Sequence, residues 1–265
     1  MIANLNKWFQ TMQISWTTLM AYRLNFALLV LGPALVFYFV KVSLWQTLYI
    51  DDTTVLQGFN LKEMLHYQSW SLVIVLLAQS SNGVNLSEDI RLGRISKYMV
   101  YPFNFWEFHT ASFLSFQSLQ FFIAGICLAL LLFLDVLIIE NLNYFFIGVL
   151  YSLLVGLFWF SVQYFTGLMA FWLDETWTMR AVFQIIVNFL SGAVIPLPFF
   201  PEWAQKVLVY TPFPSLTYTP IRIFMGDLSG LYQGLLTLFI SMLFMIVINT
   251  LVWKKGVRLF SAAGM

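Results

Sequence analysis

The densest group of ionisable side chains lies at 86–102, in the string Leu-Ser-Glu-Asp-Ile-Arg-Leu-Gly-Arg-Ile-Ser-Lys-Tyr-Met-Val-Tyr-Pro. Five charges fall within ten residues of a chain that is only 9% charged: Glu88, Asp89, Arg91, Arg94 and Lys97. Acids precede bases, the order that a helix dipole favours. Fixed charges of both signs on a short exposed element can recognise a soluble partner by charge complementarity.

The spacing within 86–102 favours one continuous short helix. Ser87 can cap its first turn, and Pro102 ends it. On such a helix Ile90, Arg94 and Lys97 share one face. One face can then lie against the rest of the chain while another meets a soluble partner. The alternative is a plain charged loop between two membrane spans.

Groups for catalysis or metal binding are sparse. The chain contains no G-x-x-x-x-G-K-[ST] string, so we expect no P-loop ATP hydrolysis by this chain. His66 and His109, the only histidines, lie near the ends of apolar runs, and no Cys, His and carboxylate cluster has metal-ligand spacing. We therefore expect a chain that is not an enzyme and binds no metal or cofactor. It also lacks a basic patch for nucleic acid.

The composition is that of an integral membrane protein. The 265 residues are 60% hydrophobic, with a mean hydropathy of +0.82, whereas soluble domains are about 45–50% apolar and about 25% charged. Cys127 is the only cysteine, which excludes a disulfide within the chain. The predicted fold class is an all-α membrane protein whose main partner is the lipid bilayer.

Apolar runs predict six spans in one domain, 1–265. They lie at about 24–48, 67–86, 105–134, 144–173, 181–195 and 231–253. The fifth is shorter than the roughly 20 residues of a full crossing. Prolines then interrupt 196–227, which predicts a re-entrant segment on the outer side of the membrane. Residues 4–20 alternate apolar and polar side chains at helical spacing, which predicts an amphipathic helix in the membrane interface.

Lysines and arginines set the orientation. Nine of the 13 lie on the side that holds both termini, 86–102 and the turn 174–180. Basic residues stay cytoplasmic, which predicts a multi-pass protein of the plasma (inner) membrane with both ends in the cytoplasm. Lys41 is expected to snorkel to the outer interface. Every charged residue lies in a loop or close to a span end, so an ion-driven carrier has no obvious coupling group, and energy is expected to enter from another subunit.

The order of these parts resembles the membrane subunit of an ABC exporter of the type-2 (ABC-2) permease class. Four short strings carry the resemblance: Glu-Asp-Ile-Arg-Leu-Gly-Arg-Ile at 88–95, Asn-Phe-Leu-Ser-Gly at 188–192 ahead of Ile-Pro-Leu, Tyr-Thr-Pro-Phe at 210–213 and Ser-Ala-Ala-Gly at 261–264. The last is similar to a subgroup whose permeases often work in pairs. The resemblance covers nearly the whole chain, and its specificity lies in the order of the parts.

The resemblance implies a transport cycle with separate engines. Two permease subunits, identical or homologous, would form the pathway, and two ABC ATPase subunits would bind ATP and Mg²⁺. Residues 4–20 would be the connecting helix and 86–102 the coupling helix. The residues expected to contact the ATPase are Glu88, Asp89, Arg91 and Arg94. The turn 174–180 would add to the docking surface, and transport would run outward.

An uncharged polar stripe is the candidate substrate path. Gln184, Asn188, Ser191 and Ile195 step by three or four residues, and Gln79 and Asn82 do so on the second span. Hydrogen bonding between helices of one subunit explains the same pattern. Because the stripe is uncharged, it favours a large or amphiphilic, weakly charged substrate over a small ion. Two other functions remain open: a stand-alone ion-coupled carrier or channel, and a non-transporting membrane scaffold.

Overall fold

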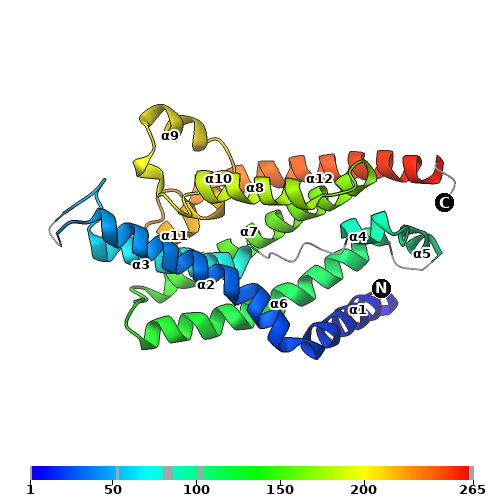
Figure 1. Ribbon diagram of the computed structural model, residues 1–265, viewed down its shortest axis with the longest axis horizontal. Helices are drawn as coiled ribbons and strands as arrows, with labels where there is room; N and C mark the ends of the chain where they lie inside the picture. The colour runs from blue at the N-terminus through cyan, green and yellow to red at the C-terminus, as the bar shows by residue number, and fades with distance from the viewer. Residues whose placement is uncertain (1, 52–53, 80–85, 101–103, 263–265) are drawn as a thin grey trace.

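The computed structural model describes residues 2–51, 54–79, 86–100 and 104–262, which form helices and connecting turns with no β-strand among them. The longest helices run broadly along the longest axis of the molecule (Figure 1). The beginning of α1 (Ile2–Ala21), the end of α12 (Leu231–Ala262) and the short helices α4 and α5 lie at the same end (Figure 1). The arrangement matches an all-α membrane protein.

Four helices in the described ranges are long and apolar enough to cross a membrane. They are α2 (Arg23–Leu48), α6 (Phe105–Phe133), α7 (Leu142–Leu168) with its 3-10 extension η1 (Met169–Phe171), and α12. The predicted boundaries of α2, α6 and the combined α7 and η1 agree to within about two residues. The helix at the C-terminal end continues beyond residue 253, where the expected span ended, to Ala262.

The other two expected spans are shorter helices with different ends. The helix α3 covers Leu61–Ala78, 18 residues, and begins before the predicted residue 67. Asn60 and Glu63 explain this start, because each backbone N–H donates to the other side chain, at 3.0 and 2.8 Å. The helix α8 covers Trp177–Leu190, 14 residues. It ends there because Gly192 has a left-handed φ of +84°.

The helix α3 occupies the middle of the bundle. Nearly all side chains from Tyr67 to Ala78 are buried, and the helix packs against α2, α6, α7 and α11. A helix surrounded by protein does not need the lipophilic surface of a lipid-facing helix, which explains why α3 retains several polar side chains. The largest fully buried side chains are those of Trp70 in α3 and Trp159 in α7.

Residues 196–227 fold into short helices joined at prolines: η2 (Leu197–Phe199), α9 (Glu202–Leu208), α10 (Phe213–Leu216) and α11 (Tyr218–Phe224). The last of these packs tightly on the bundle. The Phe224 ring stacks on Trp70 with centroids 4.4 Å apart. The Phe224 ring also lies so close to Gly148 that a Cβ added to this glycine would stand 2.6 Å from the ring. The re-entrant course of this segment stays a prediction.

The helix expected at 4–20 lies within α1, which packs on α6 through polar contacts. The Trp16 indole donates to Ser118 at 2.8 Å, and the Ser115 hydroxyl donates to the backbone carbonyl of Met12 at 2.8 Å. Phe9 and Ile14 remain exposed. An apolar face is therefore left free on a helix that is anchored to the bundle by hydrogen bonds.

Candidate functional site

The charged segment forms two short helices, so the prediction of one continuous helix is wrong. The helix α4 covers Leu86–Arg91 and α5 covers Ile95–Val100. Gly93 separates them with a φ of +70°, a conformation that glycine adopts without strain. Ile90 and Lys97 consequently belong to different helices and share no helical face, and Pro102 lies outside the described residues. We call residues 86–100 the elbow.

Asp89 is the centre of the elbow. Its side chain is buried, with 5% of the residue exposed. The Tyr98 hydroxyl donates to Oδ2 at 2.8 Å, and Arg94 Nη1 lies 3.4 Å from Oδ1. Lys97 Nζ stands 3.9 Å from Oδ1, and His109 Nε2 of α6 lies 3.5 Å from Oδ2. One carboxylate therefore ties α4 to α5, whereas His109 Nε2 is buried beside it without a hydrogen-bond partner in the described part of the chain.

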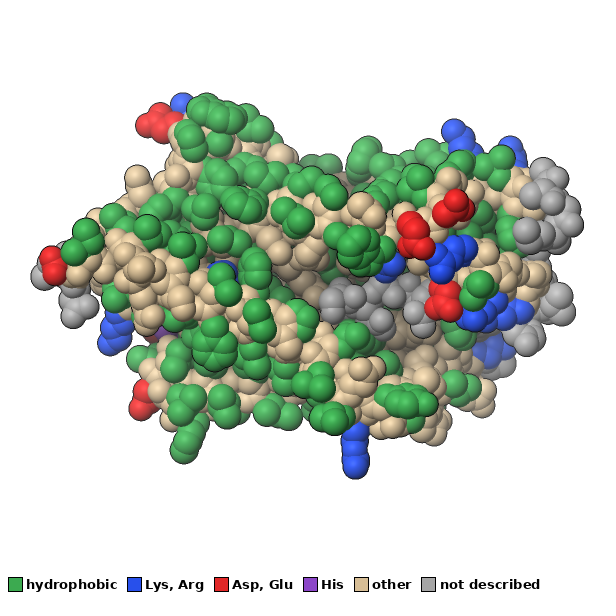
Figure 2. Space-filling view, in the orientation of Figure 1, with side chains coloured by type: hydrophobic (Ala, Val, Ile, Leu, Met, Phe, Trp, Pro, Cys, Tyr) green, Lys and Arg blue, Asp and Glu red, His purple; other side chains and the backbone are tan. Residues whose placement is uncertain are grey.

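The other charged side chains of the elbow face outward. Arg91 Nη1 pairs with Glu175 Oε1 at 2.8 Å and donates to the Asp174 carbonyl at 3.2 Å, which joins the elbow to the turn before α8. Arg94 Nη2 lies 3.6 Å from Glu88 Oε1. Figure 2 shows acidic and basic side chains gathered at this end of the molecule. The elbow and the turn thus form one exposed surface of mixed charge.

The elbow also rests directly on α7. Leu86 lies so close to Gly167 that an added Cβ would stand 2.7 Å from Leu86 Cδ2. Leu86 is fully buried in a cluster with Phe105 of α6 and Leu168 of α7. A displacement of α4 is therefore passed to α7 by direct contact.

Three residues of the predicted polar stripe do come together. Gln184 Nε2 donates to Asn188 Oδ1 at 3.0 Å and lies 3.5 Å from Gln79 Oε1. Gln79 Nε2 in turn donates to Thr217 Oγ1 at 3.0 Å. Gln184 and Asn188 are half-buried, whereas Gln79 is buried. Sequence reasoning missed Thr217, which stands between two helix fragments where no periodic pattern marks it.

The other members of the stripe lie elsewhere. Because α8 ends at Leu190, neither Ser191 nor Ile195 continues the helical face, as had been expected. Ser191 is fully buried, and its carbonyl accepts from Tyr218 N at 2.9 Å. Gln79 is the C-cap of α3, and Asn82 lies outside the described residues. The contacts that are present link helices of one subunit, as the alternative interpretation of the stripe expects.

Lys41 does not snorkel to the outer interface, so that prediction is wrong. Only 4% of the residue is exposed, and Nζ donates to Ser71 Oγ at 2.8 Å and to the Ala193 carbonyl at 3.1 Å. The Tyr67 hydroxyl donates to the neighbouring Gly192 carbonyl at 2.8 Å. Carbonyls just past a helix end carry partial negative charge and attract a cation. Lys41 thus fastens the chain after α8 to α2 and α3.

The geometry offers an exposed charged surface at the elbow and a polar contact between helices. Within the described ranges, no group of three or more His, Cys, Asp or Glu side chains could hold a metal ion. A family model described as "ABC-2 family transporter protein" matches residues 12–264. No curated protein matches the chain.

Proposed function

The chain belongs to the ABC-2 family of transporter membrane proteins, and on that premise we propose that it is the permease subunit of an ATP-driven ABC exporter. The family supports a non-catalytic membrane permease that associates with ABC ATPase subunits. In the proposal, ATP and Mg²⁺ bind the partner ATPase, and a second permease, identical or homologous, completes the pathway. The chain then crosses the plasma (inner) membrane with both termini in the cytoplasm.

The elbow is the proposed coupling element, and its internal ties are the observation that carries the proposal. Glu88, Arg91 and Arg94 offer charges to a soluble partner, while Asp89 holds the two short helices together from inside. A lever must be stiff to transmit force. The elbow meets this demand through the Asp89 contacts and through the close packing of Leu86 on α7.

The polar stripe supports a substrate path with no fixed charge. Gln184 and Asn188 keep part of their surface exposed on α8, and Gln79 stands behind them. Together with Ser191 and Asn82 they are the proposed path residues. In the proposal, α8 faces the second permease, and an amphiphilic, weakly charged substrate moves between the two subunits.

Arg91→Ala tests the coupling. The Arg91–Glu175 pair is exposed, so its loss changes folding stability by only about 0–1 kcal/mol. We expect the variant to assemble in the membrane but to lose co-purification with the ATPase and stimulation of its ATP hydrolysis. Arg23→Ala, an exposed arginine at the beginning of α2, is the matched control and should keep both. Full coupling in Arg91→Ala would refute the assignment of the elbow.

A stand-alone ion-coupled carrier is the competing function, and Lys41 is the observation that bears on it. Such a carrier needs an ionisable group within the membrane, and Lys41 is one that lies buried in a membrane-length helix. Both hydrogen bonds of Lys41 go to uncharged acceptors, and no carboxylate pairs with it among the described residues. Accumulation of a solute by the purified chain alone, driven by a pH or sodium gradient, would favour this carrier over the permease.

A further inference from the structure

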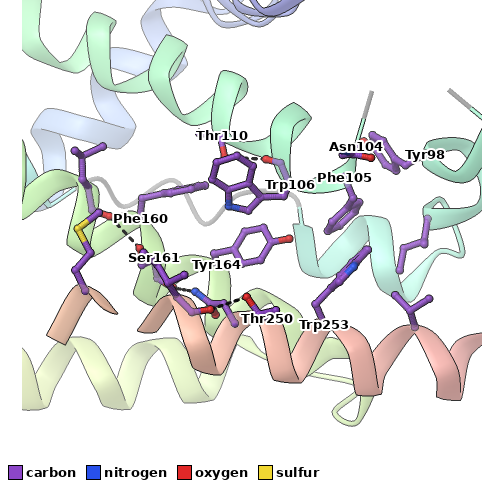
Figure 3. A pocket seen from close by; sticks show the side chains of 16 residues that line it. Tyr98, Asn104, Phe105, Trp106, Thr110, Phe160, Ser161, Tyr164, Thr250 and Trp253 are labelled. Carbon is purple, nitrogen blue, oxygen red and sulfur yellow. Dashed lines mark hydrogen bonds between the residues drawn. The ribbon is translucent and has the colours of Figure 1, made fainter. Parts of the chain in front are cut away.

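A second feature of the molecule is a cleft of about 960 Å³ whose lining includes no residue of the polar stripe. Its walls come from α5, α6, α7 and α12. Figure 3 shows a largely aromatic lining with hydroxyl groups between the rings. The labelled side chains that surround it include Trp106, Thr110, Phe160, Tyr164 and Trp253.

Polar side chains lie at the elbow end and in the middle of the cleft, mixed with aromatic and aliphatic ones. Tyr98 and Asn104 line the end next to the elbow, where Trp253 directly precedes the lysines of α12. Leu157 and Met242 line the other end, deeper between the helices. No Asp, Glu, Lys or Arg is among the lining residues. The lining therefore suits an uncharged or zwitterionic amphiphile with its polar part toward the elbow.

Asn249 is the one buried amide of the lining whose hydrogen bonding is incomplete. Only 9% of the residue is exposed, and Nδ2 donates to the Ser161 carbonyl at 2.9 Å. Its Oδ1 is buried and has no hydrogen-bond partner in the described part of the chain. Buried polar atoms are nearly always paired. An unpaired acceptor on a residue that lines a cleft calls for a donor from whatever fills the cleft.

We propose that this cleft binds one membrane lipid with an uncharged or zwitterionic headgroup that carries an N–H or O–H donor. Its acyl chain lies toward Leu157 and Met242, and its headgroup donates to Asn249 Oδ1. Both α6 and α12 have the length and apolarity of membrane spans. Lipid is therefore the amphiphile that meets the opening between them at high concentration. The apolar end at Leu157 and Met242 suits an acyl chain, and the polar groups nearer the elbow suit a headgroup.

A lipid in this cleft also touches the proposed lever. Ile95 and Tyr98 of the elbow belong to the lining, and Tyr98 donates to Asp89. The bound lipid thus supports the elbow from the membrane side. The lipid site requires only that α6 and α12 lie in the membrane. The lipid proposal can therefore fail while the permease function holds, and the permease function can fail while the lipid proposal holds.

The test is photo-crosslinking in nanodiscs. Phosphatidylcholine, whose headgroup has no N–H or O–H, forms the bilayer, and a trace of phosphatidylethanolamine with a diazirine in its acyl chain is the probe. We expect adducts to concentrate on cleft residues of the full chain. Asn249→Leu should lower their yield about fivefold, the effect of one lost hydrogen bond.

Two further variants make the result decisive. Asn143→Leu, at an exposed position at the opposite end of α7, is the matched control and should leave the yield unchanged. Thr250→Trp fills the mouth of the cleft from an exposed position and should abolish the adducts even if Asn249→Leu fails to fold. Adducts spread evenly along α12, or a yield unaffected by either cleft variant, would overturn the proposal. A disulfide between two copies of the Thr250→Cys, Cys127→Ala variant would also overturn the proposal, because a second copy of the chain, and not a lipid, would then cover the cleft.

Discussion

Asp89→Asn tests whether the elbow is held together from inside. The change keeps the shape of the side chain but removes the charge on which Tyr98, Arg94, Lys97 and His109 converge. The Tyr98 bond, at 2.8 Å and buried, is the strongest, and a hydrogen bond to a charged group contributes about 1.5–3 kcal/mol. The contacts of Arg94 and Lys97, whose side chains are partly exposed, add about 0–1 kcal/mol each. Weakening of the Tyr98 bond alone should therefore make opening of the elbow about 10- to 150-fold more frequent, and each of the two weaker contacts adds up to about fivefold.

Thiol labelling measures this opening. Ile95, which is buried in the elbow, is replaced by cysteine in a Cys127→Ala background, and the labelling rate is followed with a maleimide. We expect the Asp89→Asn rate to rise by that factor. Glu88→Gln removes a neighbouring acid whose ion pair is partly exposed and 3.6 Å long, so its rate should rise less than about fivefold. An unchanged rate in Asp89→Asn, or equal rises in both variants, would refute the reasoning.

Four further substitutions test the packing of α4, the contact of Lys41 and the carboxylate of Asp227. Gly167→Ala forces a Cβ against α4 and should destabilise the chain by about 1–3 kcal/mol. Gly125 also lies in a helix, α6, but a Cβ added there would contact nothing. Gly125→Ala should therefore be neutral or stabilising when the two variants are compared by thermal unfolding. Lys41→Met should raise amide hydrogen exchange just after α8 about tenfold, as expected when a charged hydrogen bond is lost, and equal protection in the variant would contradict the fastening role. The pKa of Asp227 is lowered from 3.8 to about 2, first by the backbone N–H of Ser229 and also by Arg222. The stabilisation by this carboxylate is present above about pH 4 and lost as the pH falls toward 2. Asp227→Asn should therefore lower the melting temperature at pH 7 but hardly at all near pH 2, and a constant difference would contradict this.

The long helices could be predicted from the sequence because apolar length alone defines them. The boundaries of α2 and α6 come from runs that end at polar residues. The beginning of α3 could not be found in this way, because its first turn is polar. The capping box of Asn60 and Glu63 marks the beginning of α3, and this signal lies between the first two predicted spans. At Gly93 a left-handed residue broke a helix that spacing and charge order favoured.

The site shows the limit of sequence reasoning more clearly. The string at 88–94 names the charged residues of the elbow but not their directions. Asp89 points inward, where the Tyr98 hydroxyl donates to it and His109 lies beside it. These positions depend on the turn at Gly93 and on the packing of α6. One of the two acceptors of Lys41, the Ala193 carbonyl, likewise lies 152 residues away in the sequence. Contacts of this kind arise from tertiary packing and leave no periodic trace.

A photo-crosslink from the elbow in living cells tests the central claim most directly. The photoreactive residue p-benzoylphenylalanine replaces Leu92, which is 53% exposed at the turn between α4 and α5. The matched control is the same replacement at Ile138, an exposed residue in the connection between α6 and α7. The account predicts an adduct between position 92 and an ABC ATPase subunit, identified by mass spectrometry, and none from position 138. An adduct at 92 without an ATPase, or equal ATPase adducts from both positions, would contradict it.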